Sequence, residues 1–161
     1  MAKKFLIAVA GIVAVMAALV VLPGVSKQSG SLSIEYYRDN MVRDESGRYN
    51  VAARETLKIG NDGSASYSSS AGQPERRFTI SGDEMKVLRE LFLNTGFMDI
   101  PKTDYPEKAG LANYTRYELS VADEDDSQSI RWVNPGAGNE STPSIIVNAG
   151  TRLDAIIERY S

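Results

Sequence analysis

The sequence predicts an α+β fold, in which an N-terminal transmembrane helix precedes an antiparallel sheet with two amphipathic helices packed on one face. Three observations lead to this fold class. An unbroken apolar segment lies near the N-terminus, later segments alternate apolar and polar residues, and two segments repeat apolar residues with helical spacing. Since the order is strands, helix, hairpin, helix, we expect an antiparallel sheet with both helices covering one face.

The apolar segment covers residues 5–22 and follows a short basic start, residues 1–4, that contains two lysines. As a helix it would span about 27 Å, close to the ~30 Å hydrocarbon core of a bilayer. The basic start favours a cytoplasmic N-terminus, a membrane anchor at 5–22 that contacts the lipid bilayer, and a main domain outside the cytoplasm. The alternative is a signal peptide cleaved after Ser26, which would secrete the same domain.

A short polar linker, residues 23–30, leads into a domain that spans residues 31–161. One hairpin has an Asp62-Gly63 turn, a dipeptide that suits tight turns because both positions tolerate positive φ. The charged segment 39–50 is expected to form a loop. Alternating patterns predict six strands, at residues 31–38, 51–59, 64–69, 75–80, 114–122 and 127–133.

Two segments are typical of amphipathic helices. The first begins after Ser81, which has the spacing of a capping box with Glu84, and it ends near Gly96. The second follows Thr142-Pro143 and runs to about Tyr160. Each carries an apolar stripe that needs cover, and the sheet can supply that cover.

The composition excludes several kinds of chemistry. The 161 residues contain no Cys and no His, so disulfides, thiolate nucleophiles, imidazole bases and Cys/His zinc sites are ruled out. A net charge of −3 argues against nucleic-acid binding, which needs clustered basic residues. The acidic segment 123–126 lacks the spacing of a calcium loop and is expected to be a solvated hairpin tip. We therefore expect no metal, no cofactor, no catalytic residue and no enzyme activity.

A few residues are candidates for binding or modification. Arg76 and Arg77 precede a strand, where they can meet an acidic partner, although surface charges on an edge strand explain them equally. Trp132 is the single tryptophan and can be either a core residue or an exposed anchor for a protein partner. Asn113 and Asn139 begin triplets that match glycosylation acceptors.

The stretch from residue 77 to 159 resembles a known family. A helix follows Phe78-Thr79-Ile80-Ser81, and the exit from this helix reads Thr95-Gly96-Phe97-Met98-Asp99-Ile100-Pro101. A Tyr-centred strand, Ser129-Ile130-Arg131-Trp132 and a Pro-led helix complete the order. This order is similar to that of emfourin-type inhibitors of thermolysin-like metalloproteases, and to uncharacterised envelope proteins. The resemblance implies the same fold over about half of the chain. The matching elements are fold determinants, and no inhibitory contact residue carries over.

The sequence therefore predicts a membrane-anchored, extracytoplasmic, non-enzymatic binding module whose partner is unknown. A protease inhibitor of the emfourin type is the first alternative, because of the family resemblance. An enzyme that uses carboxylates or a Ser/Lys pair is the second.

Overall fold

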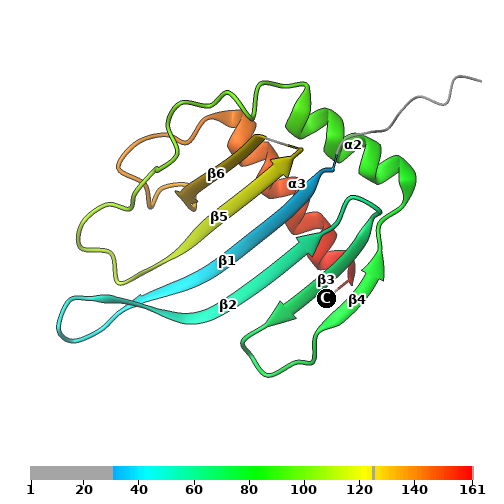
Figure 1. Ribbon diagram of the computed structural model, residues 1–161. Helices are drawn as coiled ribbons and strands as arrows, with labels where there is room; N and C mark the ends of the chain where they lie inside the picture. The colour runs from blue at the N-terminus through cyan, green and yellow to red at the C-terminus, as the bar shows by residue number, and fades with distance from the viewer. Residues whose placement is uncertain (1–30, 125, 161) are drawn as a thin grey trace, which may run out of the picture.

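The computed structural model describes residues 31–124 and 126–160, which form one antiparallel sheet and two helices (Figure 1). The six strands lie in the order β4-β3-β2-β1-β5-β6, and every neighbouring pair is antiparallel. The elements are β1 (Ser33–Arg43), β2 (Tyr49–Ile59), β3 (Ser64–Ser69), β4 (Arg76–Thr79), α2 (Gly82–Leu93), β5 (Asn113–Asp123), β6 (Asp126–Val133) and α3 (Ser144–Tyr160).

The predicted fold class needs one correction, which concerns the transmembrane helix. Across residues 31–124 and 126–160, neither helix combines the length and the apolar character that crossing a bilayer requires. α2 has 12 residues, and the 17 residues of α3 include charged side chains. Residues 1–4, 5–22 and 23–30, the predicted cytoplasmic start, anchor and linker, lie outside the described residues. The fold class of the described chain is therefore α+β without a membrane-spanning helix.

The loop predicted at residues 39–50 is mostly strand. β1 continues to Arg43 and β2 begins at Tyr49, so the connection is a short turn at residues 44–48. One of the charges that suggested a loop, Asp39, lies instead on the sheet face that no helix covers, where it pairs with Arg54 of β2 and Arg116 of β5. Asp44 and Arg48 pair with each other within the turn. The register between β1 and β2 shifts after Asn40, which marks a β-bulge.

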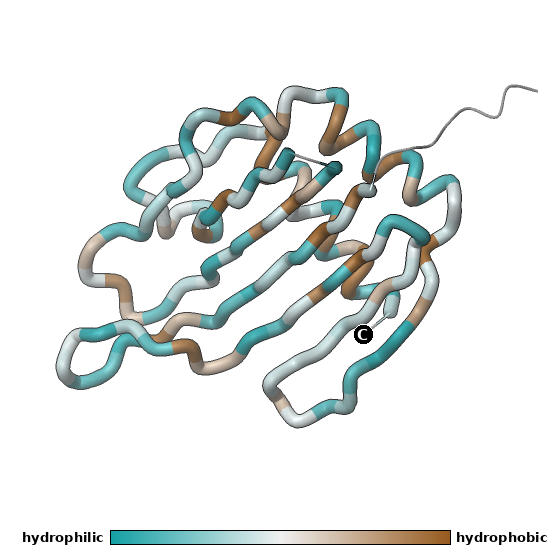
Figure 2. Tube along the Cα trace, viewed as in Figure 1, coloured by the Kyte–Doolittle hydropathy of each residue, from teal (hydrophilic) through white to brown (hydrophobic). Residues whose placement is uncertain are grey.

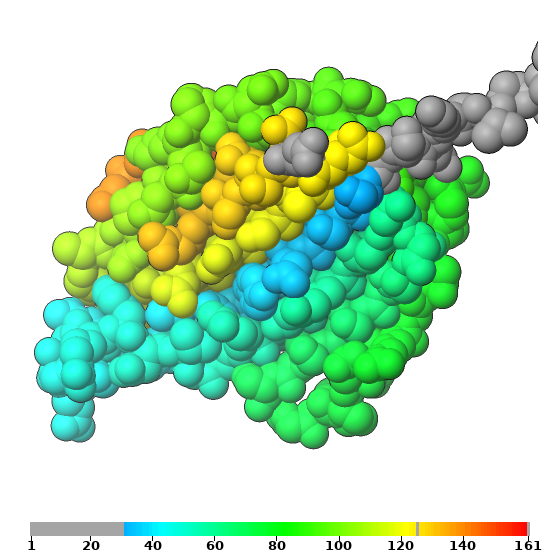
Figure 3. Space-filling view, in the orientation of Figure 1, coloured from blue at the N-terminus to red at the C-terminus, as the bar shows by residue number. Residues whose placement is uncertain are grey.

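The main core lies between the sheet and the two helices (Figures 1 and 2). Alternate residues of each strand point toward the helices, and the stripes of α2 and α3 cover them. A smaller apolar cluster of Met41, Tyr114, Val133 and Ala137 lies at one end of the sheet. By strand alternation it belongs to the opposite face, which Figure 3 shows without a helix over its strands.

Ser81 caps α2 as predicted, but the capping box is only half formed. The Ser81 hydroxyl accepts a hydrogen bond from the Glu84 backbone N–H at 3.2 Å. The Glu84 carboxylate does not reach back to the cap. It accepts two 3.2 Å hydrogen bonds from Nη1 of Arg159 instead, and thereby joins α2 to the last turn of α3.

Replacing Ser81 with alanine is expected to lower the free energy of unfolding by about 1 kcal/mol, because an N–H of the first turn loses its acceptor. Urea denaturation followed by circular dichroism measures the change. Ser81→Asn is the matched control, since asparagine also caps helices and should retain most of the stability. An equal loss in both variants would contradict a capping role.

Candidate functional site

A cavity of about 510 Å³ lies between the first half of α3, the helix-facing side of the sheet and the loop after β6. We call it the α3 pocket. Its volume lies within the range of ~300–1,000 Å³ that is usual for small-molecule sites. Residues 134–142 form the loop wall, and four residues of α3 form the helix wall, namely Val147, Gly150, Thr151 and Asp154. These four follow the i, i+3, i+4, i+7 spacing of one helix face.

Three aromatic side chains from three strands, Tyr36, Tyr117 and Trp132, form the aromatic floor of the pocket. The rings of Tyr117 and Trp132 lie at 18° to each other with centroids 5.2 Å apart. The Tyr36 ring lies at 6° to the Tyr117 ring, at 6.2 Å. The floor forms because these residues alternate toward the helix side of adjacent strands, where cross-strand neighbours meet.

Gly150 brings α3 close to this floor. A Cβ atom at position 150 would lie 2.8 Å from Cζ2 of Trp132 and 3.6 Å from the Tyr36 hydroxyl. No side chain except hydrogen fits there without a shift of the tryptophan. A glycine inside a helix lowers stability by about 1 kcal/mol relative to alanine. At position 150 the close approach of the indole ring explains why a glycine is present.

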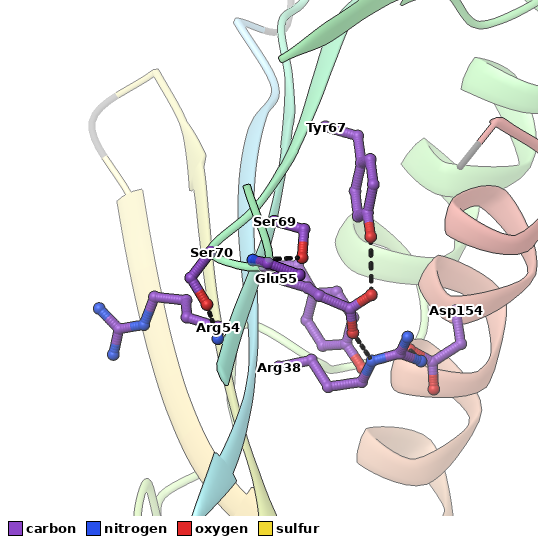
Figure 4. Close-up of polar contacts among 9 residues, drawn as sticks. Arg38, Arg54, Glu55, Tyr67, Ser69, Ser70 and Asp154 are labelled. Carbon is purple, nitrogen blue, oxygen red and sulfur yellow. Dashed lines mark hydrogen bonds and ion pairs between the residues drawn. The ribbon is translucent and has the colours of Figure 1, made fainter. Parts of the chain in front are cut away.

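Asp154 occupies the polar end of the pocket, one helical turn beyond Gly150. Its Oδ1 accepts hydrogen bonds from the Tyr36 hydroxyl at 3.0 Å and from Nη1 of Arg38 at 3.3 Å. Figure 4 shows how Arg38 connects Asp154 to Glu55, whose Oε2 lies 2.5 Å from Nε of Arg38. These contacts join α3 to β1 and β2 across the edge of the core.

The environment shifts the pKa values of these groups in a consistent way. Burial raises the pKa of Asp154 above its ordinary value, against the opposing effects of the Tyr36 hydrogen bond and the Arg38 charge. Burial also raises the pKa of Tyr36, and the neighbouring Asp154 adds to this effect. Tyr36 is therefore a neutral hydrogen-bond donor at physiological pH, and the negative charge of the pocket resides on the carboxylate.

Hydrogen bonds within the loop and to Thr115 and Lys108 hold the loop wall in place. Oδ1 of Asn134 accepts a bond from the Thr115 N–H at 2.8 Å, and the Ala137 N–H donates to the Asn134 carbonyl at 3.0 Å. The Lys108 N–H donates to the Ala137 carbonyl at 2.7 Å, and its ammonium donates to the Gly136 carbonyl at 3.1 Å. These hydrogen bonds fix the loop wall against β5 and the segment that contains Lys108.

Of the residues singled out in the sequence, Trp132 and Asn139 both line the α3 pocket, whereas the two arginines lie elsewhere. Arg76 and Arg77 are exposed on β4, at one edge of the sheet, where Arg76 donates to the Tyr160 carbonyl and Arg77 pairs with Glu75. Trp132 lies on β6, at the other edge, and is only 4% exposed. It lines the α3 pocket from within the core.

The two glycosylation triplets lie at the same end of the sheet, because Tyr114, next to Asn113, packs in one apolar cluster with Ala137, two residues before Asn139. Asn113 is the exposed first residue of β5, although the sequence predicted a loop there. Asn139 is exposed in the loop wall of the pocket, and its N–H donates to the Pro106 carbonyl at 3.0 Å. A glycan on Asn139 would therefore lie at the rim of the pocket.

Sequence reasoning missed Asp154, Tyr36, Tyr117 and Arg38 as members of a site. The sequence feature that could have indicated the site is Gly150, a glycine within the apolar stripe of α3. Asp154 follows it four positions later on the same helix face. The sequence distance between Tyr36 and Asp154 hides their contact, because only the folded sheet brings them within 3.0 Å.

The geometry suits recognition of a small ligand by stacking, hydrogen bonding and charge. No group of three or more carboxylates is arranged to hold a metal ion in the part of the chain that the structure describes. In comparisons of the whole chain with known proteins, no family model matches, and no curated protein matches in sequence.

Proposed function

We propose that this domain is a non-enzymatic binding module and that the α3 pocket is its binding site. One observation carries the proposal: the pocket combines an aromatic floor, a carboxylate and a hydrogen-bonded loop wall in about 510 Å³. Most small-molecule sites are concave, mainly apolar and equipped with a few convergent polar groups. The α3 pocket is concave and combines an aromatic floor with convergent polar groups, and a ligand or a side chain of a partner protein can fill it.

Fragment screening by nuclear magnetic resonance tests this proposal on the purified domain. We expect bound fragments to shift the signals of Gly150, Thr151 and Trp132. Thr151→Phe should abolish these shifts, because Thr151 is an exposed residue that lines the pocket. Asn148→Phe is the matched control, since Asn148 is an exposed α3 residue outside the lining.

Two outcomes would contradict the proposal. If fragments bind elsewhere, or bind the Thr151→Phe variant equally well, the pocket is not the site. If a bound ligand is chemically converted during incubation, the module is an enzyme. Recovery of each bound ligand unchanged is the expected result.

We further propose that the domain acts outside the cytoplasm. The support is the basic start at residues 1–4 and the apolar segment that follows it, a pattern typical of exported chains. A C-terminal tag on the full chain should be accessible to protease added outside intact cells. Protection of the tag in intact cells, with cleavage only after lysis, would contradict export.

Inhibition of a thermolysin-like metalloprotease is a second candidate function. Its support is the resemblance of residues 77–159 to the emfourin type. The purified domain would then inhibit such a protease at micromolar concentration. Full protease activity at that concentration would leave the binding-module proposal as the better one.

A further inference from the structure

We infer that the α3 pocket selects organic cations, which Asp154 and the aromatic floor hold together. This inference rests on the proposed binding function of the same pocket and adds the chemical class of its ligand. The shared chemistry is an ammonium or guanidinium group. It can belong to a free amine or to a lysine or arginine side chain of a peptide.

The charges around Asp154 do not cancel. The guanidinium of Arg38 is shared between Glu55 and Asp154, at 2.5 Å and 3.3 Å. A third carboxylate, Glu158, also acts on the Asp154 carboxyl from one turn further along α3. Two carboxylates therefore share one guanidinium, and Glu158 adds further negative charge near Asp154.

One oxygen of Asp154 is available to a ligand. Tyr36 and Arg38 both donate to Oδ1, and within the described residues no donor reaches Oδ2. Oδ2 is in contact with solvent, and the side chain is 26% exposed where it lines the pocket. An ammonium that enters the pocket can therefore donate a charge-assisted hydrogen bond without displacing an existing partner.

Burial makes the Asp154 charge costly in the empty pocket, as the raised pKa of this carboxyl indicates. A bound cation would offset the cost of burying the Asp154 charge, which Arg38 offsets only in part. Lys108, a cation that also lines the pocket, donates to the Gly136 carbonyl and is not one of the strongest charges that act on Asp154. The carboxylate thus has a reason to favour a positively charged ligand.

The aromatic floor favours the same ligand class. A cation over an aromatic face is attracted by the π electrons. Tyr117 is half-buried and lines the cavity together with Asp154, whereas Trp132 is nearly buried between its neighbouring rings and α3. A carboxylate and aromatic faces in one pocket are the two elements that recognise alkylammonium groups.

A pair of ligands that are matched in shape but differ in charge tests the inference. Choline and 3,3-dimethyl-1-butanol have almost the same shape, but only choline is charged. Because Trp132 is the single tryptophan, its fluorescence reports binding in the pocket directly. We expect choline to bind at least tenfold more tightly, and equal affinities would overturn the inference.

Asp154→Asn removes the charge and retains the shape of the side chain. We expect at least a tenfold loss of choline affinity, whereas Glu90→Gln, which removes one negative charge at an exposed α2 position outside the pocket lining, should cost less than threefold. Unchanged choline affinity in Asp154→Asn would overturn the inference.

If Asp154→Asn does not fold, the pH dependence of choline binding by the wild type still tests the inference. Choline affinity should rise between pH 4 and pH 7 as Asp154 ionises, and a flat profile would contradict the role of its carboxylate. The groups that face Asp154 are Tyr36 and Arg38 of β1, Glu55 of β2, Tyr117 of β5 and Glu158 of α3.

Two further ligands identify the source of the cation. Tighter binding of a capped Gly-Lys-Gly peptide than of butylamine would indicate a protein partner, and the reverse would indicate a free amine. If neutral fragments bind the pocket and cations gain nothing, the inference fails while the binding function stands. If no compound binds, both fail.

Discussion

Replacing Trp132 with alanine is expected to lower the free energy of unfolding by about 3–5 kcal/mol, the usual range for loss of a large buried aromatic side chain. Trp132 is 4% exposed and packs between the rings of the aromatic floor and the backbone of α3. Gly150 has no side chain that could move into the resulting cavity. Urea denaturation followed by far-ultraviolet circular dichroism measures the loss.

Because Trp132 and Gly150 are in close contact, we expect substitutions at these two positions to have non-additive effects on stability. In the wild type, Gly150→Ala should destabilise the domain by about 1–2 kcal/mol, because overpacking outweighs the gain in helix propensity. In the Trp132→Ala background the same change should stabilise by up to about 1 kcal/mol. Additive effects in the double-mutant cycle would contradict the contact.

Replacing Asp39 with asparagine is expected to lower the free energy of unfolding at pH 7 by about 1–3 kcal/mol. The Asp39 carboxylate is 4% exposed and accepts hydrogen bonds from Arg54 at 2.7 and 2.8 Å and from Arg116 at 2.8 Å. The two guanidiniums are 45% and 25% exposed, so water offsets part of the loss. The expected effect is therefore smaller than for a fully buried ion pair.

The effect of Asp39→Asn should depend on pH. Burial alone would raise the pKa of Asp39, but the hydrogen bonds from Arg54 and Arg116 outweigh burial and lower it. A carboxyl whose pKa is lower when folded stabilises the protein above its unfolded pKa of about 3.9 and loses that contribution as the pH falls. The difference between wild type and variant should be full above about pH 5 and shrink below about pH 4.

Glu118→Gln is the matched control for Asp39→Asn. Glu118 lies on the neighbouring β5 strand and on the same sheet face by alternation, but it is only half-buried. Its replacement should change the free energy of unfolding by less than about 0.5 kcal/mol. A loss as large as that of Asp39→Asn would show that net charge, and not the specific ion pairs, stabilises this face.

Local patterns were sufficient to predict most elements of the fold. The stripe of α3 and the cap at Ser81 depend on residues three to four positions apart, so the sequence displays them directly. The segment after Asp39 was assigned to a loop because charged residues suggest exposure. Asp39 is instead paired across strands, and its contact with Arg116 joins positions that are distant in the chain.

The α3 pocket was harder to predict, because it also depends on contacts between residues that are distant in the chain. Trp132 was recognised as a candidate, but its location within the core depends on Gly150 and on rings from two other strands. Asp154 has no neighbour in sequence that marks it as part of a site. Its role emerges only when α3 crosses β1 and brings the carboxylate to Tyr36.

The central position of β1 has a consequence for the order of events during synthesis. β1 leaves the ribosome before every other strand and finds β2 soon afterwards, but its second neighbour, β5, begins only at residue 113. Until then, one edge of an 11-residue strand has no partner from its own sheet. Exposed edges of this kind pair with other chains. Nascent chains that end before residue 113 should therefore aggregate, while chains that reach Asp123 can close the sheet around their first strand.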